Sequence, residues 1–461
     1  MEQTRYDYDV IIVGGGLTGS ALATALADGR RRILVLEARK GKNPRFNGEL
    51  IHPHGVDQLD ELGFLGPLHA AGGVDVTGFA VVHGRDIAPT TLPYSEIPGS
   101  RQHGFAIDHH DLVETMRSIA SAKPHVEYRF GERVTALIHD EERVVGVQTP
   151  AGALRAPLVL AADGRHSKVR ALVELAERAR LISYTAAARL PDCNLPAPGH
   201  GHIFLGAPGP ILAYPISTSD ARTCIDLPSD MDRGKDAVLR SIKRDYLPVL
   251  PDVVRPSFDR ALADGEIEIA ANYAIYTDEC TVPGLALVGD ACGCSHPLTA
   301  TGMTVALNDV LALKRAIDGV PLAEPARLDA ALELYQQERY RFVRAREILA
   351  DALYEVFLGG EPGTRAIREG IFRYWNTSAS GRARSMALLS GHDSRLDSFI
   401  REYVKVVAIS TSAALLGRVS DPAAPGSATL ACRVRSLIGL GRKTVEKVGV
   451  VARSVREGYL A

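Results

Sequence analysis

The chain has 461 residues, of which 46% are hydrophobic, and its formal net charge is −2 at pH 7. This length is sufficient for two or three domains with a substantial core. The balanced charge argues against a nucleic-acid partner, and the six scattered cysteines lack zinc-site spacing, so we expect no bound metal. No apolar run reaches the roughly 18 residues that cross a bilayer. No signal peptide precedes the first expected strand, which predicts a cytoplasmic protein.

The N-terminal segment carries a dinucleotide-binding pattern. Residues 9–13 form an apolar run typical of a buried strand, and Gly14, Gly16 and Gly19 follow in GxGxxG spacing before an alanine-rich helix. Gly14 permits the tight turn, Gly16 lets the backbone approach a pyrophosphate, and Gly19 lets the helix pack on the strand. A second strand ends at Glu37, whose carboxylate is placed to bind the ribose hydroxyls of an adenosine. We therefore expect no NADP(H) at this position.

Two later apolar runs end in turns that also suit a flavin nucleotide. Residues 158–161 lead to Asp163, and residues 285–288 lead to Asp290, which can accept a hydrogen bond from a sugar-alcohol hydroxyl. From Pro297 onward we expect a helix whose free backbone N–H groups and positive dipole end favour negative charge on a reduced flavin ring. Together with the GxGxxG turn, these motifs predict FAD as the cofactor.

Three side chains beside the last motif have more than one interpretation. Cys292 and Cys294 form a CxC pair for which a redox role is conceivable, but small packing residues are the favoured interpretation. We expect His296 to position the turn rather than to transfer protons.

The order of the elements predicts interleaved domains. The expected FAD-binding domain comprises residues 1–75, 105–175 and 280–325, the expected substrate domain comprises residues 76–104 and 176–279, and residues 326–461 form a helical C-terminal region. Within the substrate domain, strand character is found in residues 76–82, 180–188, 202–214 and 222–227. The predicted fold class is α/β (α+β), with a Rossmann-like FAD-binding domain interleaved with a β-sheet domain.

The C-terminal segment, residues 429–461, combines seven basic residues with apolar residues at roughly helical spacing. One interpretation is a peripheral helix on an anionic membrane surface, held partly by charge and therefore weakened by salt. The other is a helix packed on its own protein with a solvated basic face. Both interpretations remain open.

With these motifs placed, the chain resembles the glutathione-reductase-type FAD monooxygenases, and it is similar to the squalene epoxidase family along nearly its whole length. The sequence RFNGEL at residues 45–50 matches the family's R-x-x-G-E-L. The sequence HPLTATGMTVALND at residues 296–309 matches its H-P-L-T-G-G-G-M-T-V-A-L-x-D. Further similarity lies in GPILAYPI from Gly209, ALYEVF at residues 352–357 and ALLSG at residues 387–391.

The resemblance places several residues at FAD-contacting positions. Arg45 would bind the pyrophosphate or ribityl side, where its fixed charge and multiple donors are suitable. The other positions implied or expected to contact FAD are Gly14, Gly16, Leu17, Thr18, Gly19, Glu37, Ala38, Asp163, Asp290, Gly302 and Met303.

The chain departs from the family pattern near the expected substrate pocket. The family's G-E-L-L-Q-P-G-G reads GELIHPHG here, so His52 replaces a glutamine, and Phe79 stands where a tyrosine that orients this glutamine is expected. Asp111 occupies the place of an FAD-binding arginine. We take His52, Phe79 and Pro297 as candidates for the flavin edge, with no obligate acid or base among them. For His52, a structural role in its loop is the alternative.

The resemblance implies an FAD-dependent monooxygenase that epoxidises or hydroxylates a large apolar, isoprenoid substrate through a flavin C4a-hydroperoxide. It also implies O2 and NAD(P)H as co-substrates, with electrons delivered directly or through a reductase. Rival functions are a flavin-dependent reductase of prenyl double bonds and a non-catalytic flavoprotein at the membrane. A flavin-dependent halogenase is disfavoured, because that class carries W-x-W-x-I-P and this chain has one tryptophan, Trp375.

Overall fold

The structure is a computed structural model that describes residues 5–41, 48–83, 88–264, 267–358, 360–419 and 430–456. Contacts divide the chain into two compact units, each built from three segments. The first unit consists of Met1–Val74, Phe105–Ile182 and Asn272–Tyr340, and the second of Asp75–Gly104, Ser183–Ala271 and Arg341–Ala461. The sequence suggested three parts, whereas contacts group the C-terminal helices from Arg341 onward with the second sheet.

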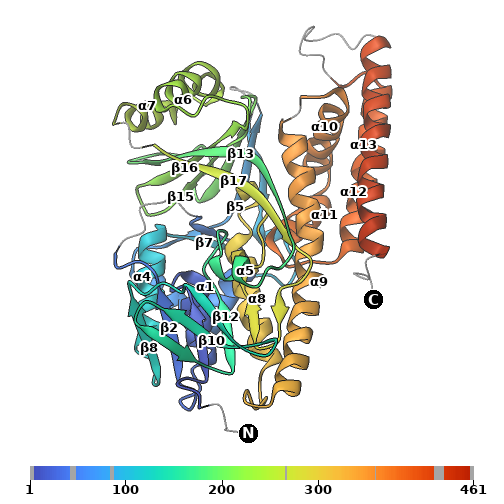
Figure 1. Cartoon of the computed structure of the whole chain (residues 1–461). Helices are drawn as coiled ribbons and strands as arrows, with labels where there is room; N and C mark the ends of the chain where they lie inside the picture. Colours follow the sequence, from blue (N-terminus) through green and yellow to red (C-terminus); the bar gives the residue numbers. More distant parts are fainter. Residues whose placement is uncertain are drawn as a thin grey trace. The chain divides into compact units, whose positions relative to one another are not determined.

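A six-stranded sheet forms the centre of the first unit (Figure 1). In spatial order its strands are β18 (Thr281–Val282), β19 (Leu285–Leu287), β12 (Leu158–Ala161), β1 (Val10–Val13), β2 (Ile33–Glu37) and β8 (Val126–Phe130). Neighbours from β19 to β8 are parallel, and β18 is antiparallel to β19. β1, β12 and β19 are buried along their whole length, which explains why they read as continuous apolar runs. The four strands predicted in this unit are confirmed.

Helices and short strands accompany this sheet. The helices are α1 (Leu17–Leu26), α2 (Pro53–Glu61), α3 (Leu65–Ala70), α4 (His109–Ser121), α5 (Lys168–Leu172) and α8 (Gly302–Ala316), with 3-10 turns η4 (Gly289–Ala291) and η5 (Pro297–Thr299). One three-stranded sheet has the order β11 (Gly152–Arg155), β10 (Arg143–Thr149), β9 (Ala136–Asp140). The other has the order β3 (Leu50–Ile51), β7 (Gly104–Ala106), β4 (Val74–Val76). α1 packs against both α4 and α8, and α2 packs against α8.

A seven-stranded mixed sheet lies mostly in the second unit. In spatial order its strands are β17 (Glu268–Thr277), β13 (Glu177–Leu190), β16 (Ala221–Pro228), β15 (Ile211–Pro215), β14 (His200–Leu205), β5 (Gly78–His83) and β6 (Thr90–Pro93). These strands confirm the strand character predicted for the four segments of the expected substrate domain. The remaining short elements are η1 (Tyr94–Glu96), α6 (Lys235–Ser241), η2 (Ile242–Tyr246), η3 (Leu247–Val249) and α7 (Arg255–Asp264).

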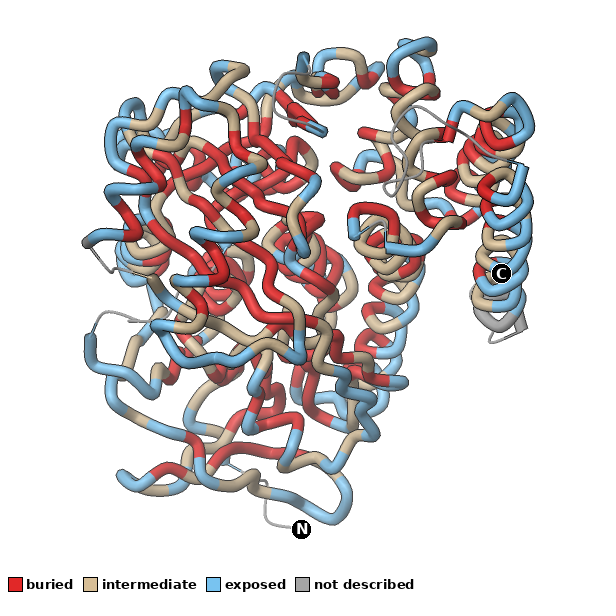
Figure 2. Tube along the Cα trace, turned by 90° about the horizontal axis from the view of Figure 1, so that it is seen from above, coloured by how far each residue is buried: buried red, intermediate tan, exposed pale blue. Residues whose placement is uncertain are grey.

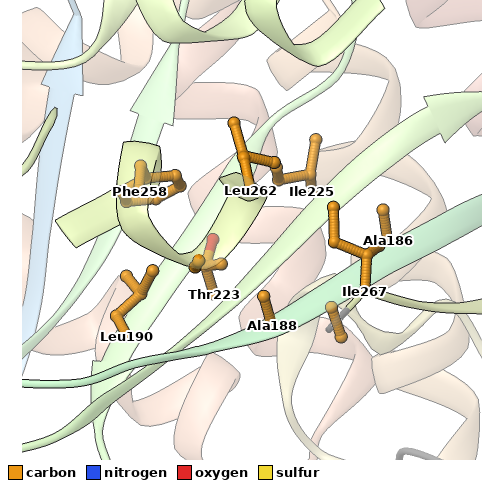
Figure 3. Close-up of a pocket in the computed structure, with 10 residues that line it drawn as sticks. Ala186, Ala188, Leu190, Thr223, Ile225, Phe258, Leu262 and Ile267 are labelled. Carbon is orange, nitrogen blue, oxygen red and sulfur yellow. The ribbon is translucent and has the colours of Figure 1, made fainter. Parts of the chain in front are cut away.

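A small apolar pocket lies between this sheet and α7 (Figure 3). Phe258 and Leu262 of α7 line it together with Ala186 of β13 and Ile225 of β16. The hydroxyl of Thr223, the polar side chain in the lining, donates to the Leu212 carbonyl at 3.4 Å. The pocket therefore offers packing surface and no group suited to catalysis.

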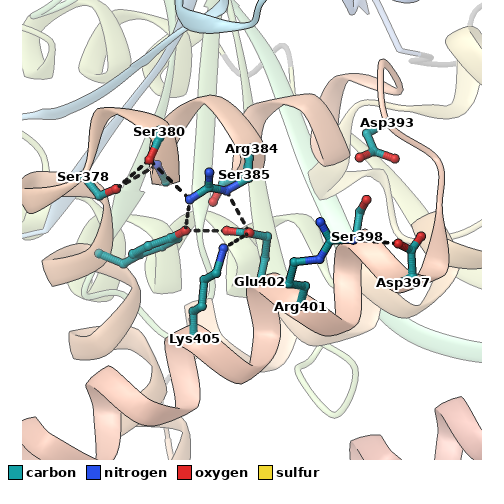
Figure 4. Close-up of polar contacts among 12 residues, drawn as sticks. Ser378, Ser380, Arg384, Ser385, Asp393, Asp397, Ser398, Arg401, Glu402 and Lys405 are labelled. Atoms are coloured by element: carbon teal, nitrogen blue, oxygen red, sulfur yellow. Dashed lines mark hydrogen bonds and ion pairs between the residues drawn. The ribbon is translucent and has the colours of Figure 1, made fainter.

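The C-terminal helices are α9 (Pro325–Leu358), α10 (Pro362–Thr377), α11 (Ala379–Ser390), α12 (Leu396–Leu415) and α13 (Leu430–Arg456), which confirms the predicted helical region. Buried Glu402 of α12 joins three of them (Figure 4). Its carboxylate accepts a hydrogen bond from the Tyr374 hydroxyl of α10 and pairs with Arg384 of α11 at 2.8 Å and Lys405 at 2.7 Å. This network is a structural link among the helices.

Helix α13 carries exposed residues along its length (Figure 2). Several of these are large and apolar, with exposed fractions of 68% for Ile438 and 73% for Val445; Leu430, Val434 and Val448 are also exposed. In the parts of the chain that the structure describes, no helix is both long and apolar enough to cross a membrane.

Candidate functional site

The glycines of the GxGxxG turn have different structural roles. Gly14 has a positive φ of 102°, and a side chain there would collide with the Ala162 carbonyl. A side chain at Gly19 would collide with the Gly14 carbonyl, so helix α1 packs directly on the turn. A Cβ at Gly16 would meet no atom within 4 Å. The chain itself requires Gly14 and Gly19, whereas Gly16 leaves open space of the kind that a pyrophosphate fills.

The start of α1 fits an anionic group. Gly16 is its N-cap and contributes no side-chain cap, and Leu17 and Thr18 form its first turn. Because the first N–H groups of a helix have no partner within the helix, they are donors for phosphate oxygens, and the helix dipole favours negative charge there.

Glu37 stands at the carboxyl end of β2, beside the glycine turn. Its carboxylate accepts hydrogen bonds from the N–H of Gly15 and the N–H of Arg39, both at 2.9 Å, and the Arg117 guanidinium lies 3.4 Å away. Each carboxylate oxygen can accept more than one hydrogen bond, so these contacts orient Glu37 and leave acceptor capacity for a ribose. Ala38 follows and is exposed.

Arg117 was not singled out from the sequence. Its Nε donates to the Gly15 carbonyl at 2.5 Å, while Asp111, at the position expected to hold an arginine, is exposed in the first turn of α4. The structure thus brings an arginine to the glycine turn from further along the same helix. Arg45 lies outside the described residues.

Asp163 caps a helix. Its carboxylate accepts hydrogen bonds from the Ser167 hydroxyl at 2.6 Å and the Lys168 N–H at 2.7 Å, at the start of α5. Burial raises the pKa of Asp163, against the lowering effect of these hydrogen bonds. The contact between Asp163 and FAD stays a prediction.

The Gly289–Asp290 turn follows β19 after one residue, Val288, and lies against helix α1. Gly289 has a φ of 65°, and a Cβ there would lie 2.9 Å from the Thr18 hydroxyl. Burial raises the pKa of Asp290, while the charges of Arg165, Arg339 and Arg170 lower it. The Asp290 carboxylate offers two oxygens, each of which can accept hydrogen bonds. This acceptor fits a hydroxyl-rich cofactor chain.

The helix after this turn begins later than the sequence suggested. Pro297 opens the short turn η5, Ala300 adopts a left-handed conformation with a φ of 50°, and α8 begins only at Gly302. The expected helix start at Pro297 is therefore wrong, because the left-handed Ala300 interrupts the helical path. The His296 ring accepts the Leu298 N–H at 3.1 Å, which confirms its predicted role in positioning the turn.

His52, which follows β3 in the N-terminal part of the chain, contacts the same turn, η5. It is fully buried, and its Nε2 donates to the Thr299 carbonyl at 2.8 Å. Nearby, a Cβ at Gly48 would lie 3.7 Å from the Met303 side chain. The described part of the RFNGEL segment therefore packs beside the start of α8. The hydrogen bond from His52 holds the backbone of η5.

Phe79 belongs to the second unit. It is buried in β5 and packs edge-on against Tyr94, with ring centroids 6.4 Å apart. A Cβ at Gly201 would lie 2.8 Å from its ring, so Gly201 makes room for this phenyl group. The role of Phe79 at the flavin edge stays a prediction.

No disulfide bond joins the six cysteines, all of which lie in the described residues. Burial alone would raise the pKa of Cys292, but a hydrogen bond with Cys280 and the charge of Arg339 outweigh it and lower the pKa to about 6. The Cys294 thiol donates to the Tyr273 carbonyl at 3.5 Å. No group of three or more potential metal ligands occurs in the part of the chain that the structure describes.

The first unit thus gathers Gly16, Thr18, Glu37, His52, Asp290 and Met303 around the carboxyl ends of parallel strands and the starts of α1 and α8. This is the location at which open α/β sheets bind ligands. Sequence reasoning missed Arg117, Asp309 and Arg339. Asp309 ends the A-L-x-D part of the matched motif and had a signal; Arg339 had none, since it lies on a different helix.

Comparisons with known proteins agree with this arrangement. The family profile for squalene epoxidase matches residues 155–423, and a profile for an NAD(P)-binding Rossmann-like domain matches residues 12–56. A squalene epoxidase of Aspergillus fumigatus is 34% identical over 381 residues, covering 80% of this chain and 79% of that protein. Squalene epoxidase 3 of Arabidopsis thaliana is 33% identical, covering 87% and 77%.

Solved structures show the same fold at lower identity. PqsL of Pseudomonas aeruginosa, solved with 2-aminobenzoylacetate, aligns with a TM-score of 0.66 at 24% identity, covering 76% of this chain and 96% of that one. The p-nitrophenol 4-monooxygenase PnpA of Pseudomonas putida aligns with a TM-score of 0.70 at 19% identity, covering 84% and 98%.

Proposed function

The chain belongs to the squalene epoxidase family and is an FAD-dependent monooxygenase, and from this premise we propose that it epoxidises or hydroxylates a large apolar isoprenoid. The observation that carries the proposal is the 34% identity to a squalene epoxidase over 80% of the chain. The gathering of the predicted cofactor residues in the first unit supports it. One atom of O2 enters the substrate, and the other leaves as water with two electrons from reduced nicotinamide.

We propose that the first unit holds FAD through three contacts. The start of α1 at Gly16 takes the pyrophosphate, Glu37 takes the adenosine ribose, and Asp290 takes the ribityl chain. FAD, once bound and reduced, supplies the activation of O2 that no amino-acid side chain provides. The open space at Gly16 and the position of Gly289 beside Thr18 of α1 are the observations that support this assignment.

The residues around the turn η5 have a positioning role in this proposal. His52 Nε2–H holds the Thr299 carbonyl at 2.8 Å, and the His296 ring holds the Leu298 N–H at 3.1 Å. These bonds fix the backbone just before α8. The free N–H groups at the start of α8, and the positive end of its helix dipole, would then favour negative charge on the flavin. A site that excludes water would favour oxygen transfer over unproductive release of reduced oxygen.

The test is a product assay with purified, FAD-loaded protein, NAD(P)H and an added flavin reductase. The substrates are squalene, other polyprenyl hydrocarbons and prenylated aromatic compounds. We expect substrate-dependent O2 consumption and a product heavier by one oxygen atom in mass spectrometry. Saturation of a double bond without O2 consumption would establish the reductase instead, and flavin turnover unaffected by every substrate would contradict the monooxygenase proposal.

We further propose that squalene is a poor substrate compared with another apolar isoprenoid. His52 and Phe79 replace the glutamine and tyrosine that the family uses together, and a phenyl ring has no hydroxyl to orient a partner. The double variant His52→Gln, Phe79→Tyr should raise squalene turnover at the expense of the native substrate. Efficient conversion of squalene by the wild-type protein would contradict this.

The cofactor contacts are tested by FAD titration of the apoprotein. Asp290→Ala and Glu37→Ala each remove a hydrogen bond, so FAD binding should weaken by about 1 to 3 kcal/mol. Asp140→Ala is the matched control, because this exposed carboxylate ends β9, outside the elements that form the glycine turn and the Gly289–Asp290 turn. Equal FAD affinity of all three variants would refute the assignment of these carboxylates.

We propose that α13 attaches the protein peripherally to membranes mainly through its exposed apolar residues. Its basic residues are partly engaged within the protein, because Lys447 lies 3.5 Å from Glu355 and the Arg442 guanidinium lies 2.5 Å from Glu361. Salt should therefore weaken the attachment less than a purely basic helix would imply.

Liposome co-sedimentation tests this attachment. Ile438→Ser with Val445→Ser should reduce the bound fraction strongly, at low and at high salt. Val253→Ser is the control, since this exposed valine lies outside α13. Unchanged binding of the α13 variant would leave α13 as a helix packed on its own protein.

A further inference from the structure

Asp309 and Arg339 form a buried ion pair at the end of β19. Asp309 of α8 is 0% exposed, and the Arg339 side chain of α9 is 4% exposed. The Asp309 Oδ2 atom pairs with Arg339 Nη1 and also accepts the Gly289 N–H at 2.9 Å. The Arg339 Nη2 atom in turn lies 3.5 Å from the Gly289 carbonyl. Two helices thus contact both backbone polar groups of one glycine.

Gly289 is the residue on which the orientation of the next peptide depends. Its left-handed conformation turns the chain sharply from β19 toward Asp290, and a Cβ there would lie 2.9 Å from the Thr18 hydroxyl and 3.2 Å from the Ala306 Cβ. Because the N–H of the Val288–Gly289 peptide and the carbonyl of the Gly289–Asp290 peptide both contact this buried pair, neither peptide plane has much freedom to rotate. The direction in which Asp290 leaves the turn is therefore set by residues remote from it in sequence.

We propose that Asp309 and Arg339 are positioning residues that pre-organise the Gly289–Asp290 turn for FAD. This inference rests on the proposed contact between the turn and the ribityl chain. Neither side chain needs to touch the cofactor. A binding group that is already held in its bound geometry loses less freedom when the ligand arrives, so disturbing the support should weaken binding.

A second ion pair provides a matched comparison at the opposite end of the same strand. Asp329 of α9 pairs with Arg143 at 2.8 Å and accepts the Gly284 N–H at 3.3 Å. Gly284 also has a left-handed φ, of 79°. The chemistry is the same, an aspartate shared between an arginine and a glycine N–H, but Gly284 precedes β19 whereas Gly289 follows it.

The experiment compares two charge-neutral double variants, Asp309→Asn with Arg339→Gln and Asp329→Asn with Arg143→Gln. Each removes an ion pair without leaving one charge behind. For both, the melting temperature of the apoprotein and the FAD dissociation constant of the folded protein are measured separately. A role confined to folding would lower the melting temperature and leave the dissociation constant unchanged.

We expect the Asp309–Arg339 double variant to raise the FAD dissociation constant about tenfold, the equivalent of one lost hydrogen bond. The Asp329–Arg143 double variant should leave this constant within a factor of about two, which is the size of a neighbouring surface effect. An FAD dissociation constant that is equal in the two double variants overturns the inference.

If the first double variant fails to fold, Arg339→Lys replaces it. Lysine keeps the charge beside Asp309 but loses the planar second donor toward the Gly289 carbonyl, so the apoprotein should fold while FAD binding weakens. Wild-type FAD affinity in this variant overturns the inference. The Asp290→Ala titration separates the two ideas: weak binding there with normal binding in the pair variants retains the proposed cofactor contact and removes only the positioning role.

Discussion

Each of the two compact units contains a buried aspartate that contacts several secondary-structure elements, and the two carboxylates have different partners. Asp309 in the first unit is balanced by a full cation, Arg339, and by one backbone N–H. Asp226 in the second unit accepts hydrogen bonds from the hydroxyls of Ser183 at 2.5 Å and Tyr354 at 3.0 Å. Asp309 fixes a turn at the end of a strand, whereas Asp226 links two strands and a helix.

The difference shows what each unit uses its buried polar groups for. In the parallel sheet of the first unit, polar groups gather where strands end, so a rigid ion pair there controls the geometry of a binding turn. In the second sheet, polar side chains lie within strands: Asp226 in β16 and His202 in β14 are both buried. Such groups join strands to neighbouring segments, and their loss should affect stability and not cofactor affinity.

The largest expected effect is that of Asp309→Asn alone. This change removes the carboxylate that pairs with buried Arg339, and breaking a buried ion pair costs about 3 to 5 kcal/mol of unfolding free energy. Urea unfolding of the apoprotein measures it. A loss of unfolding free energy below about 1 kcal/mol would mean that Arg339 finds another partner or water, as surface cations do. Asp309 would then contribute no more to stability than Asp226.

A pH effect should come from the second unit. His202 Nε2 accepts the Ala197 N–H at 2.9 Å, and burial lowers the pKa of His202 to about 4. The folded state therefore binds this proton less readily than the unfolded chain, whose histidine pKa is about 6.5. The contribution to stability is complete above about pH 6.5 and declines as the pH falls toward 4, by about 3 kcal/mol at most.

The variant His202→Gln isolates this contribution, because glutamine also offers an acceptor and does not titrate. Unfolding in urea at pH 7 and pH 4.5 should show a smaller acid loss for the variant than for the wild-type protein. Equal losses would show that the pKa of His202 in the folded protein is not lowered below that of the unfolded chain.

The smallest of these effects is expected for Asp226→Asn. The amide keeps one acceptor oxygen and the hydroxyl donors are neutral, so the cost should be about 2 kcal/mol, below that of Asp309→Asn. FAD affinity, measured in the same preparations, should match the wild-type value. A change in FAD affinity would mean that the polar centre of the second sheet also supports the cofactor, contrary to the division drawn here.

The sequence predicted those parts of the molecule whose causes are local. The apolar runs and the glycine spacing identified β1 and the start of α1, because a buried parallel strand and a tight turn each depend on neighbouring residues. The start of α8 was placed too early, since nothing in the local pattern signals the left-handed Ala300. Arg339 was missed because its contact with Gly289 depends on how α9 packs, which no short-range pattern encodes.

The order in which the sheet strands occur along the chain also constrains how the protein is made. β1 ends at Val13, but its neighbour β12 begins at Leu158, and β19 completes the parallel array only at Leu285. At typical synthesis rates the first strand waits roughly 15 to 60 s on the ribosome for that last partner. Arg339 emerges later still. The complete FAD site therefore has to await these later segments, and the apolar N-terminal strand has to be shielded from aggregation until its partners emerge.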